Sequence, residues 1–164
     1  MAHAMGNTNL IPFDYSSVPD SEPSVYTDIE AMRRGIPSIT VEIGDMGTVD
    51  PEILEFAVKG LKNIMRTIGM LEGEPFVVKQ PSYLLDEYFL KSESDGIFYS
   101  HFDKGDHIEE ATLLRYTTDF WGNRIQEFRA PFSGMVHKTN SSPAINKGEH
   151  VIKLAKVVDT FSLE

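Results

Sequence analysis

The stretch that decides the fold is Gly35-Ile36-Pro37-Ser38-Ile39-Thr40-Val41-Glu42-Ile43-Gly44. Apolar residues at positions 39, 41 and 43 alternate with Thr40 and Glu42, and this period of two predicts a strand with one buried side. Glu42 then stands at the carboxyl end of the strand, where open α/β sheets gather their chemistry. A carboxylate in this position is placed to act as a general base, and the alternative is a glutamate that forms a salt bridge or caps a helix.

Two helices are expected on either side of this strand. Residues 20–34 begin with Asp-Ser-Glu-Pro and end before a glycine, which are typical helix start and stop signals. Asp50-Pro51-Glu52 predicts a second start, with Asp50 as N-cap and Pro51 at the first helical position. The apolar residues of this second helix keep the spacing of one wide face: Ile53, Leu54, Ala57, Val58, Leu61, Ile64, Met65 and Ile68. Earlier in the chain, residues 2–6 are read as a last helical turn closed by glycine and residues 10–13 as a short edge strand.

The helical period is lost after residue 72, and the chain then carries an imperfect repeat. We expect residues 1–72 to form an α/β part, residues 73–80 a linker, and residues 81–164 a β-domain. Asp-Gly-Ile-Phe at 95–98 precedes Lys-Gly-Asp-His-Ile at 104–108, and Ser-Gly-Met-Val at 133–136 precedes Lys-Gly-Glu-His-Val at 147–151. The second copy is about five residues longer around residues 140–145. Two related half-units of this kind predict a small barrel or sandwich, with a hairpin tip at residues 120–124.

The composition narrows the classes of partner. The net charge is −10 and the basic residues are dispersed, which argues against a nucleic-acid partner. The chain has no cysteine, so it has no disulfide or thiolate metal ligand, and the cytoplasm is the expected compartment. No apolar run approaches the roughly 18 residues of a membrane span, so no membrane partner is expected.

The order of these features resembles the succinylglutamate desuccinylase/aspartoacylase family, a branch of the zinc carboxypeptidase-like hydrolases. Its most specific parts are residues 35–44 and the Ala-Pro-Phe-Ser-Gly turn at 130–134. The resemblance covers nearly the whole chain but only the C-terminal half of the family's pattern. It implies an α/β remnant of a zinc carboxypeptidase-like mixed sheet, with residues 1–72 as the C-terminal part of the catalytic domain, followed by an all-β barrel-sandwich-like domain.

The resemblance also implies a chemistry. Such a protein is a metal-dependent amidohydrolase that removes an acyl group from a small-molecule N-acyl amino acid. Glu42 matches the family's catalytic glutamate, which would deprotonate a zinc-bound water and return the proton to the leaving amine. The family's zinc is held by a His-x-x-Glu pair and a later His ahead of the catalytic strand, whereas only His3 precedes Glu42 here. We therefore expect the zinc ligands to lie upstream of this chain, no metal ligand within it, and no activity from the isolated chain.

Several other residues are weaker candidates. His107 and Glu110 fit the spacing His-x-x-Glu, but the second copy carries Lys153 in place of the glutamate. This difference favours surface positions for His107 and His150. The remaining candidates are more typical of structural or solvated side chains: His101, His137, Asp45, Arg33 and Arg34.

The alternative is that the chain is not catalytic and serves as a β-barrel-sandwich module with a structural or binding role. Biotinyl and lipoyl carriers of this architecture place a lysine on the hairpin tip between the half-units, but residues 115–128 contain no lysine. A carrier is therefore disfavoured, and a structural module stays open. Exposed apolar surface on the α/β part would also allow copies of the chain to associate as a homo-oligomer. The acyl group and the amino acid are left open by these residues.

Overall fold

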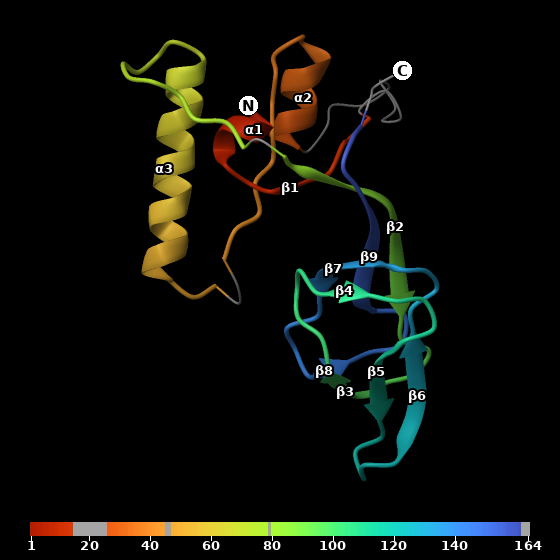
Figure 1. Cartoon of the computed structure of the whole chain (residues 1–164). Coiled ribbons are helices and arrows are strands. Elements are labelled where there is room, and N and C mark those ends of the chain that lie inside the picture. The colour runs from red at the N-terminus through yellow and green to blue at the C-terminus, as the bar shows by residue number, and fades with distance from the viewer. Residues whose placement is uncertain (15–25, 45–46, 79, 162–164) are drawn as a thin grey trace. The chain divides into compact units, whose positions relative to one another are not determined.

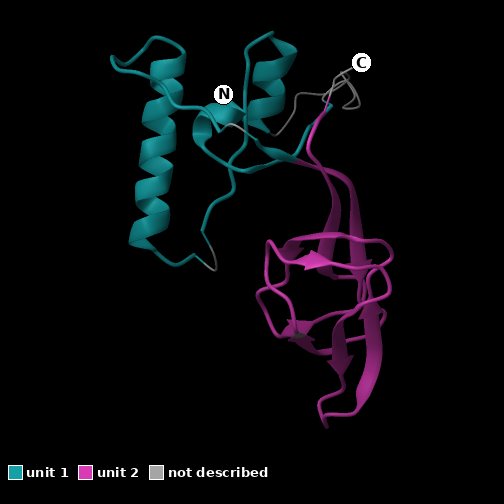
Figure 2. Ribbon diagram, in the orientation of Figure 1, with its two compact units in different colours: residues 1–82 teal, residues 83–164 magenta. Residues whose placement is uncertain are grey.

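The computed structural model describes residues 1–14, 26–44, 47–78 and 80–161 (Figure 1). The chain divides into two compact units, Met1–Ser82 and Tyr83–Glu164 (Figure 2). All helices of the described residues lie in the first unit, and two sheets are present, so the mixed α/β class is confirmed. The predicted domain boundaries, with a linker at residues 73–80, stay a prediction. No helix of the described residues combines the length and the apolar character needed to cross a membrane.

Helix α3 (Pro51–Thr67) is the longest element of the first unit and begins where the sequence predicts. The Asp50 carboxylate accepts hydrogen bonds from the backbone N–H groups of Glu52 at 2.8 Å and Ile53 at 3.3 Å. These bonds satisfy two of the N–H groups that a helix start leaves without a partner, and Pro51 has no N–H to satisfy. The predicted N-cap is therefore confirmed.

Helix α1 (Ala2–Met5) packs against the middle of α3. Gly60 lets the two backbones approach, because a Cβ at this position would overlap the Met5 carbonyl oxygen and lie 2.7 Å from its Sδ. Asn63 is fully buried, and its Nδ2 donates to the carbonyl oxygens of Ala4 at 2.7 Å and Phe76 at 2.6 Å. Its Oδ1 accepts from the Phe76 N–H at 2.9 Å. One side chain thus joins α1, α3 and the segment that follows α3.

Residues 36–43 form no strand, so the strand predicted there is wrong for the described residues. The alternating pattern is present, but a strand exists only where its backbone groups pair with a neighbour. Helix α2 (Thr27–Arg33) precedes this segment, and the predicted helix start at residues 20–25 lies outside the described residues. Strand β1 (Asn9–Leu10) is shorter than predicted, since it ends before Pro12.

Part of the apolar face of α3 is exposed. The buried residues of the helix are Gly60 and Asn63, while a row of large apolar side chains is exposed to between 37% and 57%. We call this row the α3 stripe, and its residues and exposed fractions are Leu54 56%, Val58 43%, Leu61 57%, Met65 37% and Ile68 52%.

The second unit contains two antiparallel sheets. One follows the order β2 (Ser82–Lys91), β9 (His150–Val158), β7 (Gly134–Thr139) and β4 (His107–Ile108). The other follows β6 (Arg124–Arg129), β5 (Leu113–Thr118), β3 (Gly96–Ser100) and β8 (Ala144–Ile145). Residues 94–155 contain no helix, and the predicted hairpin tip at residues 120–124 joins β5 to β6. The described strands form no closed barrel, so the barrel-sandwich detail stays a prediction.

One hydrophobic core draws on both sheets of this unit. Its fully buried members include Leu114 of β5, Val136 of β7 and Leu154 of β9. The repeat seen in the sequence corresponds to related backbone contacts, because a Cβ at Gly96 would overlap the Thr118 carbonyl oxygen and one at Gly134 that of Ala155. Each half-unit therefore brings a glycine against the backbone of a neighbouring strand.

Replacing Gly60 with alanine should lower the stability of the first unit. Alanine is the better helix former by about 1 kcal/mol, but its methyl group would push α1 away from α3. We expect a net loss of about 1–3 kcal/mol in the free energy of unfolding. Far-ultraviolet circular dichroism during urea unfolding measures this value, and Lys62→Ala on the exposed side of α3 is the control. A more stable Gly60→Ala protein would contradict the close approach.

Replacing Asn63 with alanine should cost about 2–4 kcal/mol. The change removes three hydrogen bonds and leaves the Ala4 carbonyl and the Phe76 N–H without their partner in a buried setting. The same unfolding experiment measures the loss. Amide hydrogen exchange should also become faster in α1 and at Phe76, and unchanged exchange at both places would show that Asn63 does not hold them.

Candidate functional site

Glu42, the predicted catalytic residue, lies exposed in the extended segment between α2 and α3. This segment is tied to α2, because the Thr40 hydroxyl donates a hydrogen bond to the Asp28 carboxylate. The Ile29 N–H donates to the same carboxylate at 2.9 Å. The Thr40 hydrogen bond, with that of Ile29, holds the pKa of Asp28 below its ordinary value, so Asp28 is a charged anchor at neutral pH. This hydrogen bond thus ties the segment that carries Glu42 to α2 at Thr40.

The arginines near this segment are engaged elsewhere. Arg33 and Arg34 both pair with Glu30, at 3.0 Å and 3.4 Å between guanidinium nitrogen and carboxylate oxygen. Both guanidinium groups therefore pair with Glu30, from Arg33 in the last turn of α2 and from Arg34 at its C-cap. Asp45, the other charged candidate, lies outside the described residues.

The histidines are spread over the structure. His107 and His150 begin β4 and β9 and are exposed, as predicted. The other three histidines lie apart from one another. His3 is in the last turn of α1. The ring centres of His101 and Tyr116 are 5.6 Å apart, and His137 Nε2 lies 3.5 Å from Glu87 Oε1. Among the described residues, no three or more His, Cys, Asp or Glu side chains come together in a group that could hold a metal ion. The described residues thus do not fit a catalytic zinc, which needs three protein ligands.

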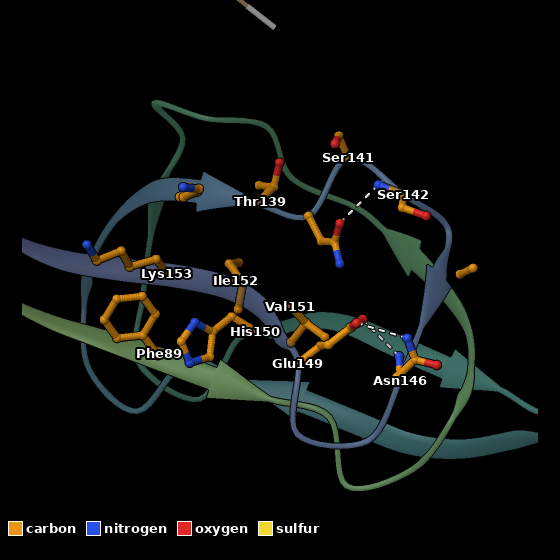
Figure 3. A pocket seen from close by; sticks show the side chains of 13 residues that line it. Phe89, Thr139, Ser141, Ser142, Asn146, Glu149, His150, Val151, Ile152 and Lys153 are labelled. Atoms are coloured by element: carbon orange, nitrogen blue, oxygen red, sulfur yellow. Dashed lines mark hydrogen bonds between the residues drawn. The ribbon is translucent and has the colours of Figure 1, made fainter. Parts of the chain in front are cut away.

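A pocket of about 590 Å³ lies in the second unit, between β9 and the loop after β7 (Figure 3). The residues that line it are Phe89, Lys138, Thr139, Asn140, Ser141, Ser142, Ala144, Asn146, Glu149, His150, Val151, Ile152 and Lys153. Most of this set was missed by the analysis of the sequence. The signal that points to it is the extra length of the second half-unit at residues 140–145, which supplies one wall.

The charged groups of this pocket are held by neighbours. Lys153 Nζ lies 2.5 Å from Glu87 Oε1, and the His150 ring contacts Phe89 in a tilted arrangement, with 4.4 Å between ring centres and 36° between ring planes. Glu149 accepts from the backbone N–H and the side-chain amide of Asn146, both at 2.9 Å, and these bonds hold the pKa of Glu149 below its ordinary value. The lining thus combines ammonium, carboxylate, amide and hydroxyl groups, which suit the binding of a small polar molecule.

Arg115 is a further buried charge that the sequence did not reveal. Its side chain is 1% exposed, its guanidinium donates to the Phe102 carbonyl at 2.7 Å, and it lies 4.9 Å from the Phe98 ring centre. Desolvation lowers its pKa to about 10, and the nearby Asp103 carboxylate opposes this shift. Arg115 is thus still protonated at neutral pH and ties the loop after β3 to the core.

No family model matches this sequence. Among characterised proteins, the chain is 26% identical over 148 residues to the N-alpha-acetyl-L-2,4-diaminobutyric acid deacetylase of Halomonas elongata. That match covers 87% of this chain and 43% of the deacetylase. The chain thus spans less than half the length of this relative.

Solved structures give the same result for the fold. The product-bound ectoine utilization protein of Ruegeria pomeroyi matches 94% of this chain and 47% of its own, with a TM-score of 0.80 and 24% identity. The succinylglutamate desuccinylase/aspartoacylase of Rhodobacter sphaeroides matches 97% of this chain and 48% of its own, with a TM-score of 0.79 and 19% identity. The chain therefore shares the fold of part of the succinylglutamate desuccinylase/aspartoacylase family, and the resemblance predicted from its sequence is confirmed.

Proposed function

We propose that this chain is the part of an N-acyl amino acid deacylase that carries the general base. The observation that supports this most is the match to the Halomonas elongata deacetylase, since the deacylases named among the similar structures agree with it. The substrate class is a small N-acyl amino acid, whose amide bond is hydrolysed.

Glu42 is the residue that we assign to proton transfer. Its carboxylate accepts a proton from the attacking water as the new C–O bond forms at the acyl carbon. The proton is then delivered to the nitrogen of the amino acid as the C–N bond breaks, so that a free acid and an amine leave. A glutamate that serves as base and then as acid contributes about 10²–10⁴-fold in rate.

The metal of this proposal is zinc, which the family resemblance implies. The described residues do not assemble three ligands for it, so no step is assigned to a metal here. We propose that its ligands lie in the part of the deacylase fold that this chain does not span. A non-catalytic binding module is the second candidate, and the polar pocket of the second unit favours it.

By themselves, these 164 residues should neither retain stoichiometric zinc nor hydrolyse N-acyl amino acids. The reason is that the described residues bring no three ligands together. Zinc content after dialysis and an assay on N-acetyl and N-succinyl amino acids test this expectation. Stoichiometric zinc together with turnover would show that the site is complete within this chain.

Glu42→Gln should abolish turnover in a protein that combines this chain with the remaining part of a deacylase relative. Glutamine keeps the size of the side chain but cannot accept the proton of water, so the rate should fall by about 10²–10⁴-fold. Zinc content and melting temperature should stay the same, since glutamine keeps the size of the side chain and part of its hydrogen bonding. Glu55→Gln on α3 is the control, and equal rates for both variants would leave Glu42 without a catalytic role.

A further inference from the structure

The pocket of the second unit presents a cation and a carboxylate that do not pair with each other. Lys138 and Glu149 both line it, and no ion pair within the described residues joins them. Its volume of about 590 Å³ lies in the range of small-molecule sites. Two unlike charges in one pocket favour a ligand that carries the complementary charges on a single molecule.

Lys138 provides the positive charge of this arrangement. It stands directly opposite Lys153 in the pairing of β7 with β9, so both side chains lie on the same face of the sheet. Like charges placed in this way repel each other. Glu87 compensates Lys153, with 2.5 Å between Oε1 and Nζ, whereas no carboxylate of the described residues pairs with Lys138. A ligand carboxylate at Lys138 would offset the remaining repulsion.

Glu149 provides the negative charge. Its two oxygens accept from the backbone N–H and the side-chain amide of Asn146, and Figure 3 shows it turned toward Asn146 and away from Lys153. Each oxygen keeps a further acceptor position, so the carboxylate is able to bind an ammonium group. Asp95 adds a second negative charge near Glu149. Glu149 and Lys153 are four residues apart, about 13 Å along an extended chain, so the two charges of the pocket lie at different ends.

The lining between these charges combines hydroxyl groups with one aromatic ring. Ser141 and Ser142 lie on the loop after β7, which is held by a hydrogen bond of 3.0 Å from the Ser142 N–H to Asn140 Oδ1. Phe89 is 40% exposed and is the largest apolar side chain of the lining. This surface suits a short aliphatic chain that separates two charged groups.

We propose that this pocket binds a small zwitterion of the aliphatic ω-amino acid class, with its carboxylate on Lys138 and its ammonium on Glu149. This inference goes beyond the proposed function, because the pocket belongs to the second unit and Glu42 to the first. A dianion would bring one of its charges against Glu149, and a dication would bring one against Lys138. A zwitterion avoids both repulsions.

Three probes of nearly equal length test the charge pattern on the full chain: ε-aminocaproate, adipate and hexamethylenediamine. Isothermal titration calorimetry measures the Kd of each. ε-Aminocaproate should bind about tenfold more tightly than either of the other two, and glycine should bind more weakly because its charges are adjacent. In the presence of ε-aminocaproate, the largest changes of amide chemical shift should fall within residues 138–153.

Variants of the two charged residues show whether the binding uses them. Lys138→Gln should weaken ε-aminocaproate binding about tenfold, because a hydrogen bond to a charged group is lost. Glu149→Gln should have a similar effect. Lys147→Gln makes the same change of charge outside the lining and is the matched control for Lys138→Gln. Since Glu149 also bonds to Asn146, circular dichroism checks that its variant keeps the fold, and Lys138→Gln decides the test if it does not.

Tight binding of ε-aminocaproate that Lys138→Gln weakens and Lys147→Gln preserves supports the proposal. The proposal is overturned by an absence of binding at millimolar ε-aminocaproate, by tighter binding of adipate or hexamethylenediamine, or by equal binding to the wild-type chain and Lys138→Gln. None of these results bears on Glu42, whose role is tested separately by the turnover of its variant.

Discussion

The first unit depends on the buried amide of Asn63. Its three hydrogen bonds reach the end of α1 and both backbone groups of Phe76, at positions far from each other in the sequence. A buried side-chain amide is tolerated only because its donors and acceptor find partners. Gly60, one turn earlier, allows the close approach that brings α1 within reach. The packing of α1 on α3 therefore depends on polar contacts and a close backbone approach. The α3 stripe takes no part in these contacts and stays partly exposed.

The second unit follows a different principle. Its two copies of the sequence repeat each place a glycine, Gly96 or Gly134, against the backbone of a neighbouring strand, and the apolar side chains of both sheets share one core. The pocket lies where the copies differ in length, since Asn140, Ser141, Ser142 and Ala144 of the longer copy line it.

The match to deacylases covers part of their fold. The chain spans 43% of the Halomonas elongata deacetylase and 47% of the Ruegeria pomeroyi structure, and the first unit exposes the α3 stripe. Glu42 lies on the segment that Thr40 joins to Asp28 of α2. The proposed catalytic residue and the α3 stripe therefore both belong to the first unit.

The sequence by itself determined the elements whose signals are local. The Asp50 cap and Pro51 predicted the start of α3, the loss of helical period predicted strands without a helix over residues 94–155, and the motifs at residues 35–44 and 130–134 indicated the family. Only the tertiary structure decided what depends on partners distant in the chain. Residues 36–43 have the pattern of a strand but no strand, because pairing requires a neighbour that the described residues do not supply. Asn63 lies outside the apolar face predicted from the sequence, and only the tertiary structure shows it buried beside Ala4 and Phe76, since hydrogen-bond partners are set by the fold rather than by spacing.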